Sequence, residues 1–217
     1  MTSLGPAQFY LLLTGVGWTL LLTVAGFIFG GLGGLAVALC RTSGVRWLEA
    51  VAVAYIEIFR GTPLLLQLFI VYYGVGLLNI SMSPWIAVSF AFMLHASAFL
   101  GEIWRGSIDA IPRGQTEAAK ALSLGYLDRM RYVILPQAVK VSVPPTIGFL
   151  VQLIKGTSLA AIVGFTELAR TGTILSNITY KPLLIYFIVG VIYFAICWPL
   201  SKFGSAMERR LTPISNH

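Results

Sequence analysis

Long uncharged segments alternate with short charged ones along the whole chain. Residues 2–40 contain no Asp, Glu, Lys or Arg, and neither does the stretch from Gly61 to Gly101. A helix needs about 20 residues to cross the hydrocarbon core of a bilayer. The first stretch is therefore long enough for one crossing helix, and the second is long enough for two.

Turn-forming residues divide the second stretch at Asn79–Pro84, where Asn, Ser and Pro interrupt the apolar run. Two further apolar runs follow a charged middle segment. We predict five crossing helices, at about residues 9–40, 63–78, 84–104, 141–165 and 182–200, within a single transmembrane domain that covers residues 1–217. Within the first helix, Gly26, Gly30 and Gly34 recur every four residues, a spacing that favours close packing against another helix.

The composition agrees with membrane embedding. Hydrophobic residues make up 57% of the chain and charged residues only 11%, whereas a soluble domain has about a quarter charged residues. The predicted fold class is therefore an all-α polytopic membrane protein. The two cysteines, Cys40 and Cys197, have no metal-ligand spacing around them, so no metal site is predicted.

The distribution of basic residues predicts the orientation. If the N-terminus is outside, the outer segments hold only Arg170 and Lys181. The inner segments then hold Arg41, Arg46, Arg60, Arg105, Arg113, Lys120, Arg129, Arg131, Lys140, Lys202, Arg209 and Arg210. Cytoplasmic loops are enriched in Lys and Arg, so this orientation places the C-terminus and the middle segment in the cytoplasm. The net charge of +7 comes from these loops, which suit an anionic lipid surface and give no sign of nucleic-acid binding.

The cytoplasmic segment at about residues 113–136 has the composition of a short helix. Glu117, Ala118, Ala119 and Lys120 are strong helix formers, and Gly125 is placed to end the helix. A helix of two or three turns is marginal by itself. The residues alone leave two interpretations open, a helix that docks on a partner or a solvated connecting loop.

Residues 117–137, EAAKALSLGYLDRMRYVILPQ, resemble the EAA signature of the membrane permease subunits of ABC importers. Ser123 stands where that signature usually has glycine, and Val133 stands where it usually has isoleucine. EIFRGTPLLLQL (57–68), AFLGEIWRGSIDAIP (98–112) and IKGTSLAAIVGFTEL (154–168) resemble the polar amino-acid branch of the same superfamily, which includes histidine/lysine/arginine- and glutamine-type permeases.

This resemblance implies a division of labour between subunits. Two permeases, of the same or a related chain, would form the pore, and two cytoplasmic ATPase subunits would bind ATP and Mg and each receive one coupling helix. An extracytoplasmic solute-binding protein would deliver the amino acid, and the membrane would be the bacterial inner membrane. The chain has no G-x-x-x-x-G-K-[ST] string, and the permease itself is expected not to be an enzyme. The residues expected to couple to the ATPase are Glu117, Ala118, Ala119, Ser123, Gly125, Leu135 and Pro136.

Polar residues inside the predicted spans are candidates for a substrate path, since they are costly in a bilayer. Lys155 lies 15 residues after Lys140, or about 22 Å along a helix, and needs a carboxylate from the protein or from a substrate. A purely structural pair with Glu102 or Glu167 is the alternative, and His95 is predicted to be a hydrogen-bonded packing residue. The full candidate path is Thr62, Gln67, Glu102, Gln152, Lys155, Thr157, Ser158 and Glu167.

The leading hypothesis is thus the permease subunit of an ATP-driven importer for polar, possibly basic, amino acids. An ion-gradient-driven secondary transporter is the alternative, although such folds often contain inverted repeats and no internal repeat is evident here. A structural membrane scaffold is a third hypothesis.

Overall fold

The computed structural model describes residues 5–77 and 82–211, and all regular structure within these ranges is helical. The all-helical fold class is therefore confirmed. In chain order, the elements are α1 (Pro6–Arg41), α2 (Arg46–Gly61), α3 (Leu64–Phe69), the π-helical turn η1 (Ile70–Gly74), α4 (Val75–Leu77), α5 (Pro84–Asp109), α6 (Arg113–Ala121), α7 (Tyr126–Arg129), the π-helical turn η2 (Met130–Ile134), α8 (Leu135–Gly156), the 3-10 helix η3 (Thr157–Val163), α9 (Leu168–Thr179) and α10 (Pro182–Leu211).

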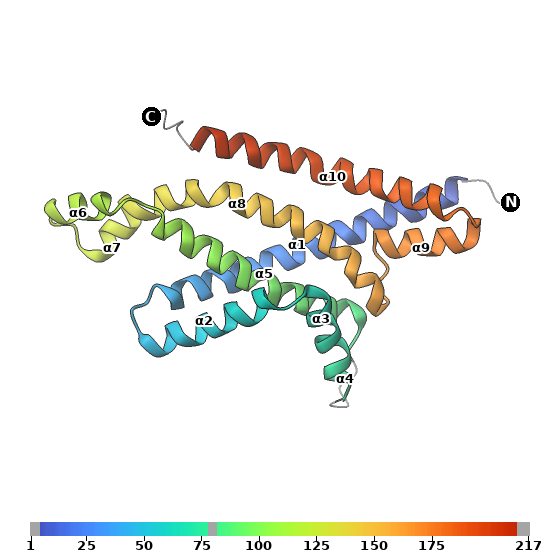
Figure 1. Cartoon of the computed structure of the whole chain (residues 1–217), viewed down its shortest axis with the longest axis horizontal. Helices are drawn as coiled ribbons and strands as arrows, with labels where there is room; N and C mark the ends of the chain where they lie inside the picture. The colour runs from blue at the N-terminus through green and yellow to red at the C-terminus, as the bar shows by residue number, and fades with distance from the viewer. Residues whose placement is uncertain (1–4, 78–81, 212–217) are drawn as a thin grey trace.

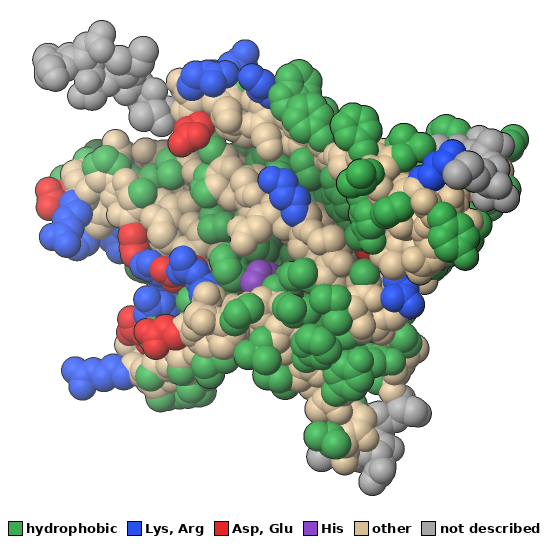
Figure 2. Space-filling view, turned by 45° about the vertical axis from the view of Figure 1, so that its right-hand side comes forward, with side chains coloured by type: hydrophobic (Ala, Val, Ile, Leu, Met, Phe, Trp, Pro, Cys, Tyr) green, Lys and Arg blue, Asp and Glu red, His purple; other side chains and the backbone are tan. Residues whose placement is uncertain are grey.

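The long helices α1, α5, α8 and α10 run along the length of the molecule (Figure 1). The short helices α6 and α7 and the C-terminus lie at one end, whereas α9 and the N-terminus lie at the other. Four helical stretches of the described chain are long and apolar enough to cross a membrane, and the bent pair α2 and α3–α4 brings the number to five. Large apolar side chains cover much of the outer surface (Figure 2), as expected where lipid surrounds the protein.

The predicted glycine face of α1 packs against α5. A Cβ added at Gly26 would lie 3.1 Å from the Cβ of Phe92, and one added at Gly30 would lie 2.4 Å from the Cβ of Ala96. At Gly34 it would lie 3.0 Å from the backbone nitrogen of Gly101. The prediction of a helix-packing face is confirmed, and the glycines explain why α1 and α5 can approach so closely.

The second predicted crossing differs from the structure. The prediction placed a straight helix at 63–78, but the described part of that range is the short chain α3–η1–α4, which follows α2 across a bend of 105°. Thr62 and Pro63 form the bend in extended conformations. Residues 46–61, which lie between the first two predicted crossings, form a helix because their apolar residues gather on one face. Of the turn predicted at Asn79–Pro84, residues 79–81 lie outside the described residues.

The later spans begin earlier or end later than predicted. The fourth predicted crossing, 141–165, overlaps a helical stretch that begins earlier, at Tyr126, and ends at Val163, and α8 continues through Pro144 and Pro145. Membrane helices tolerate proline where neighbouring groups satisfy the freed carbonyls. The helix α9 was not predicted; it precedes α10 and contributes Leu168 and Leu175 to a core cluster with Leu12 and Ile185.

Candidate translocation path and coupling segment

The segment that resembles the coupling signature projects from one end of the bundle (Figure 1). α6 has nine residues, which agrees with the predicted two or three turns. Glu117 and Ala118 are exposed, whereas Ala119 is only 3% exposed and packs into the chain itself. Of the two alanines, Ala119 is thus buried within the chain, and Ala118 is exposed to a partner.

Ser123 ends α6, and the expectation that Gly125 would do so is wrong. Ser123 has a φ of 58°, in the left-handed region. Its N–H donates to the carbonyl of Lys120 at 2.9 Å, and the N–H of Leu124 donates to that of Ala119 at 3.1 Å. These two bonds form a Schellman motif, which requires a left-handed residue at the position of Ser123. Gly125 has a φ of −62° and precedes α7 as its N-cap.

Apolar side chains surround the turn after α6. Leu122 is 76% exposed and Leu127 78%, and Tyr126 is also exposed; we call these three residues the α6–α7 tip. Leu135 and Pro136, the last matched residues of the signature, lie exposed in the first turn of α8. An exposed apolar cluster among charged residues is typical of a protein contact.

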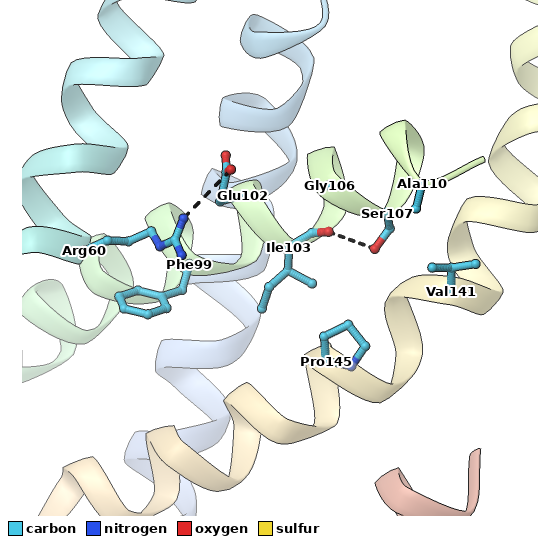
Figure 3. A pocket seen from close by; sticks show the side chains of 9 residues that line it. All are labelled: Arg60, Phe99, Glu102, Ile103, Gly106, Ser107, Ala110, Val141 and Pro145. Atoms are coloured by element: carbon cyan, nitrogen blue, oxygen red, sulfur yellow. Dashed lines mark hydrogen bonds and ion pairs between the residues drawn. The ribbon is translucent and has the colours of Figure 1, made fainter. Parts of the chain in front are cut away.

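A cavity of about 330 Å³ opens between α2, α5 and α8 (Figure 3). Its walls carry Arg60 and Glu102, joined by an ion pair of 3.8 Å, and the ring of Phe99, over which the Arg60 guanidinium lies at 5.6 Å. The remaining lining residues include Ser107 and Pro145. The cavity thus combines both signs of charge with an apolar wall, which suits a small zwitterion.

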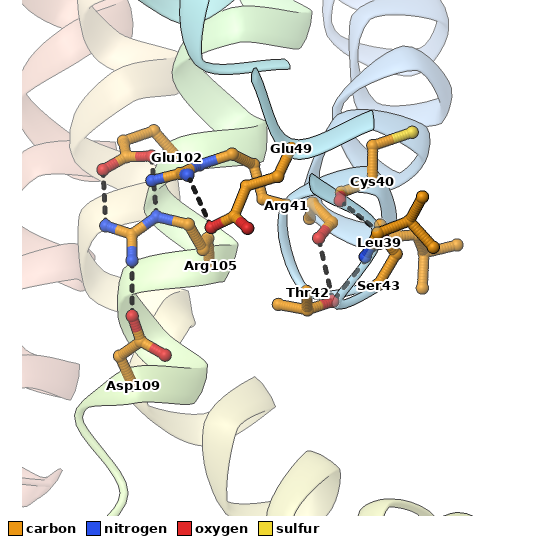
Figure 4. A network of polar contacts seen from close by, with 11 residues as sticks. Leu39, Cys40, Arg41, Thr42, Ser43, Glu49, Glu102, Arg105 and Asp109 are labelled. Atoms are coloured by element: carbon orange, nitrogen blue, oxygen red, sulfur yellow. Dashed lines mark hydrogen bonds and ion pairs between the residues drawn. The ribbon is translucent and has the colours of Figure 1, made fainter. Parts of the chain in front are cut away.

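Glu102 is held by arginines and not by Lys155. Arg105 donates from Nε to Oε2 of Glu102 at 2.8 Å and from Nη2 to Oε1 at 2.6 Å, and it also pairs with Asp109 (Figure 4). This bidentate geometry is the strong form of a carboxylate–guanidinium contact. The structural pairing of Lys155 with Glu102 is therefore not found.

Thr62 and Gln67 serve the bend between α2 and α3. The Gln67 side chain is 5% exposed, and its Nε2 donates to the carbonyl of Phe59 at 2.8 Å and that of Thr62 at 3.1 Å. It also donates to Oγ1 of Thr62 at 3.0 Å, and that hydroxyl in turn donates to the carbonyl of Ile58. Both side chains are thus committed to the backbone and do not point freely into a path.

Lys155 and Gln152 lie exposed on the outer face of α8. Within residues 5–77 and 82–211, no carboxylate forms an ion pair with Lys155. An ammonium group this far along a membrane helix is costly to expose to lipid. This face of α8 is therefore better suited to an aqueous path or to another chain than to lipid.

The polar residues after Lys155 turn inward. Thr157 is fully buried, and its hydroxyl donates to the carbonyl of Ile154 at 2.7 Å and lies 3.3 Å from that of Tyr193. Ser158 donates to the carbonyl of Lys155 at 2.8 Å. The predicted polar cluster is therefore divided: Gln152 and Lys155 are exposed, whereas the hydroxyls of Thr157 and Ser158 donate to carbonyls at the end of α8.

Glu167 is fully buried and caps α9. Its carboxylate accepts from the backbone N–H groups of Ala169 and Arg170, both at 2.8 Å, and from the hydroxyl of Tyr193 at 2.8 Å. The hydroxyl of Thr19 in α1 donates to it at 3.4 Å. Because these donors occupy its carboxylate, Glu167 connects α1, α9 and α10, and the alternative pairing of Glu167 with Lys155 is not found among the described residues.

The sequence alone did not indicate three contact partners of the candidate site residues. Arg60, which lines the cavity, lies within the block at 57–68 but was not among the predicted path residues. Thr19 and Tyr193 meet Glu167 across 148 and 26 residues of sequence. No local pattern indicates such contacts.

Comparison with known proteins also indicates a membrane transport protein. The family described as "Binding-protein-dependent transport system inner membrane component" matches residues 30–213. The L-cystine transport system permease protein TcyB of Bacillus subtilis is 39% identical over 91% of this chain and 85% of its own length. The arginine transport system permease protein ArtQ of the same organism is 36% identical over 94% of each chain.

Two solved structures share the fold. A chain from the crystal structure of an amino acid ABC transporter with histidines superposes with a TM-score of 0.89 at 35% identity, covering 97% of this chain and all of that one. A chain of the inward-facing MetNI methionine ABC transporter gives a TM-score of 0.76 at 22% identity, which bears on the fold alone. The chain belongs to the family of binding-protein-dependent transport system inner membrane components.

Proposed function

We propose that this chain forms half of the translocation path of an ATP-driven importer for amino acids. As a member of its family, it is a permease of the bacterial inner membrane and not an enzyme. The observation that carries the substrate class is the agreement between a TM-score of 0.89 to an amino acid ABC transporter and relatives named for cystine and arginine transport. These relatives are named as transport system permeases and the solved structure as an ABC transporter, so they lend no support to an ion-driven transporter.

The α6–α7 end of the bundle is proposed to face the cytoplasm. The C-terminus lies at the same end, and the N-terminus and α9 lie at the opposite end (Figure 1). Basic residues gather at this end, among them Arg113, Lys120, Arg129 and Arg209. This orientation follows the enrichment of Lys and Arg in cytoplasmic loops.

In this orientation, α6 and the α6–α7 tip are proposed to dock on an ATPase subunit. Glu117 and Ala118 would form the polar and small part of the contact, and Leu122 and Leu127 the apolar part. Ser123 would set the direction of the turn, and Leu135 and Pro136 would join the docked segment to α8. ATP and Mg would be bound by the ATPase, since the chain has no Walker A string.

The exposed face of α8 with Lys155 and Gln152 is proposed to border the substrate path. The ammonium group of Lys155 would bind the carboxylate of the amino acid. The cavity with Arg60 and Glu102, nearer the α6–α7 end, would then receive the zwitterion on its way to the cytoplasm. The second permease chain would close this path on the opposite side.

Reconstitution tests the function directly. The permease is combined in proteoliposomes with the ATPase and solute-binding protein encoded beside it, and uptake of radiolabelled amino acids is measured with and without ATP. ATP-dependent uptake is expected. Uptake that continues without ATP, driven by an ion gradient, would contradict the proposal.

Ala118→Trp tests the docking surface, with Ala50→Trp as the matched control on an exposed position of α2. The bulky ring at position 118 is expected to reduce co-purification of the ATPase by about tenfold or more, because close packing at a contact centre tolerates little added volume. The Ala50 variant should retain the ATPase. Equal retention by both variants would refute the assignment of α6 as the coupling helix.

A further inference from the structure

The bend between α2 and α3 breaks a helix at the start of the uncharged stretch that begins at Gly61. The two helices meet at 105°, and Pro63 at the bend has no N–H to donate. The last carbonyls of α2 therefore lose their helical partners. Inside a membrane such carbonyls need partners from the protein itself.

Gln67 supplies these partners from the first turns of α3. Its amide nitrogen lies 2.8 Å from the carbonyl of Phe59 and 3.1 Å from that of Thr62, so one side chain of α3 caps two carbonyls at the end of α2. A substrate-binding role would need a free amide, and this one is buried and fully engaged. Gln67 therefore acts on the shape of the chain.

The same contacts determine the tautomer of His95. Carbonyl oxygens only accept, so the nitrogen of the Gln67 amide faces Phe59 and Thr62 and its oxygen faces His95. Nδ1 of His95 lies 3.0 Å from Oε1 of Gln67. Since Oε1 cannot donate, Nδ1 carries the proton, and His95 holds the amide in the orientation that closes the bend.

His95 also connects the bend to the cavity. His95, Phe99 and Glu102 lie on one face of α5, and the ring centroids of His95 and Phe99 are 4.5 Å apart. Phe99 supports the guanidinium of Arg60, which stands on the last turn of α2 immediately before the bend. Any rotation of α2 against α3 would therefore move Arg60 relative to Glu102.

We propose that Gln67 and His95 are positioning residues for transport, whose hydrogen bond locks the α2–α3 bend and so holds Arg60 at the cavity that it shares with Phe99 and Glu102. The transport half of this inference rests on the proposed function. The locking half concerns the chain alone and can be tested separately.

Two nearly equal amide substitutions test the lock. In His95→Asn, the amide nitrogen can occupy the place of Nδ1 and donate to Gln67, whereas the longer side chain of His95→Gln carries its amide toward the place of Nε2. In the reconstituted importer, His95→Asn should stay within about twofold of the maximal uptake rate of the wild type, and His95→Gln should lose about tenfold or more. The KM for the loaded solute-binding protein should not change, because Gln67 and His95 are buried, at 5% and 6% exposed, and cannot touch that protein.

Gln67→Glu tests the same hydrogen bond by changing Gln67 instead of His95. It replaces His95→Gln as the test if that variant does not fold. A carboxylate cannot donate to the carbonyls of Phe59 and Thr62, so the bend should open. Uptake should fall by about the same factor.

Pulsed EPR measures the bend itself. Spin labels are placed at Val51 on α2 and Leu77 at the end of α4, which are 63% and 84% exposed, after Cys40 and Cys197 are replaced by alanine. A narrow distance distribution is expected for the wild type and His95→Asn, and a broader or shifted one for His95→Gln. If either the distances or the uptake of His95→Gln remain as in the wild type, the proposal is overturned. A wild-type importer that does not take up amino acids would refute the proposed function, while the EPR result would still decide the lock.

Discussion

Replacing Gly30 with alanine is expected to weaken the packing of α1 against α5. The added Cβ would lie 2.4 Å from the Cβ of Ala96, the shortest such distance among the described glycines. Carbon atoms in contact are normally about 3.5–4.0 Å apart, so the overlap exceeds about 1 Å. Both atoms are fixed to helix backbones, and the clash can be relieved only by moving the helices.

The magnitude follows from two opposing effects. Overpacking in a tight core costs about 1–3 kcal/mol, and the neighbouring contact of Gly34 with Gly101 should loosen when the helices separate. Alanine in place of glycine stabilises a helix by about 1 kcal/mol. Gly17→Ala isolates this second effect, because Gly17 lies on the same helix and an added Cβ there meets nothing within 4 Å.

SDS titration of the purified chain in mild detergent, followed by circular dichroism, measures the free energy of unfolding. Gly30→Ala should be less stable than Gly17→Ala by about 1–3 kcal/mol. Ala96→Gly removes the opposing Cβ, so the double variant should recover part of this loss as a coupling energy. If Gly30→Ala is as stable as Gly17→Ala, the close approach of α1 and α5 at Gly30 is incorrect.

Three further predictions concern single polar residues. Ser123→Gly should stabilise the end of α6 by about 1 kcal/mol, because glycine adopts a φ of 58° without steric cost; slower hydrogen exchange of the Leu124 amide would show it, and unchanged exchange would contradict it. Glu167→Leu should lower stability by about 3 kcal/mol or more, since it leaves two backbone N–H groups and a tyrosine hydroxyl without their acceptor, and Glu167→Gln should lose less; equal thermal unfolding of the two variants would count against the cap. Lys155→Met should raise the KM for amino-acid uptake by about tenfold, while Lys155→Arg should retain function. Transport assays in which both variants behave alike would argue against a carboxylate contact.

Much of the molecule follows from local patterns. The uncharged runs predicted the long helices α1, α5 and α10, and the four-residue glycine spacing predicted where α1 would be approached closely, because both depend on neighbours along one helix. The bend at Thr62–Pro63 was not predicted in the same way. Proline and threonine indicate a break, but its 105° angle depends on Gln67 and on His95, which lies 28 residues further along the chain.

The sequence by itself determined that this is a helical membrane permease with a short helix between its third and fourth predicted crossings, since hydropathy, helix propensity and signature spacing are properties of contiguous residues. Only the tertiary structure decided the partners of the polar groups. Glu102 binds Arg105 and Arg60, Glu167 binds Thr19 and Tyr193, and Lys155 is left exposed. The physical reason is that a buried charge is stabilised by whichever groups the fold brings within hydrogen-bond distance, and those groups come from helices far apart in sequence.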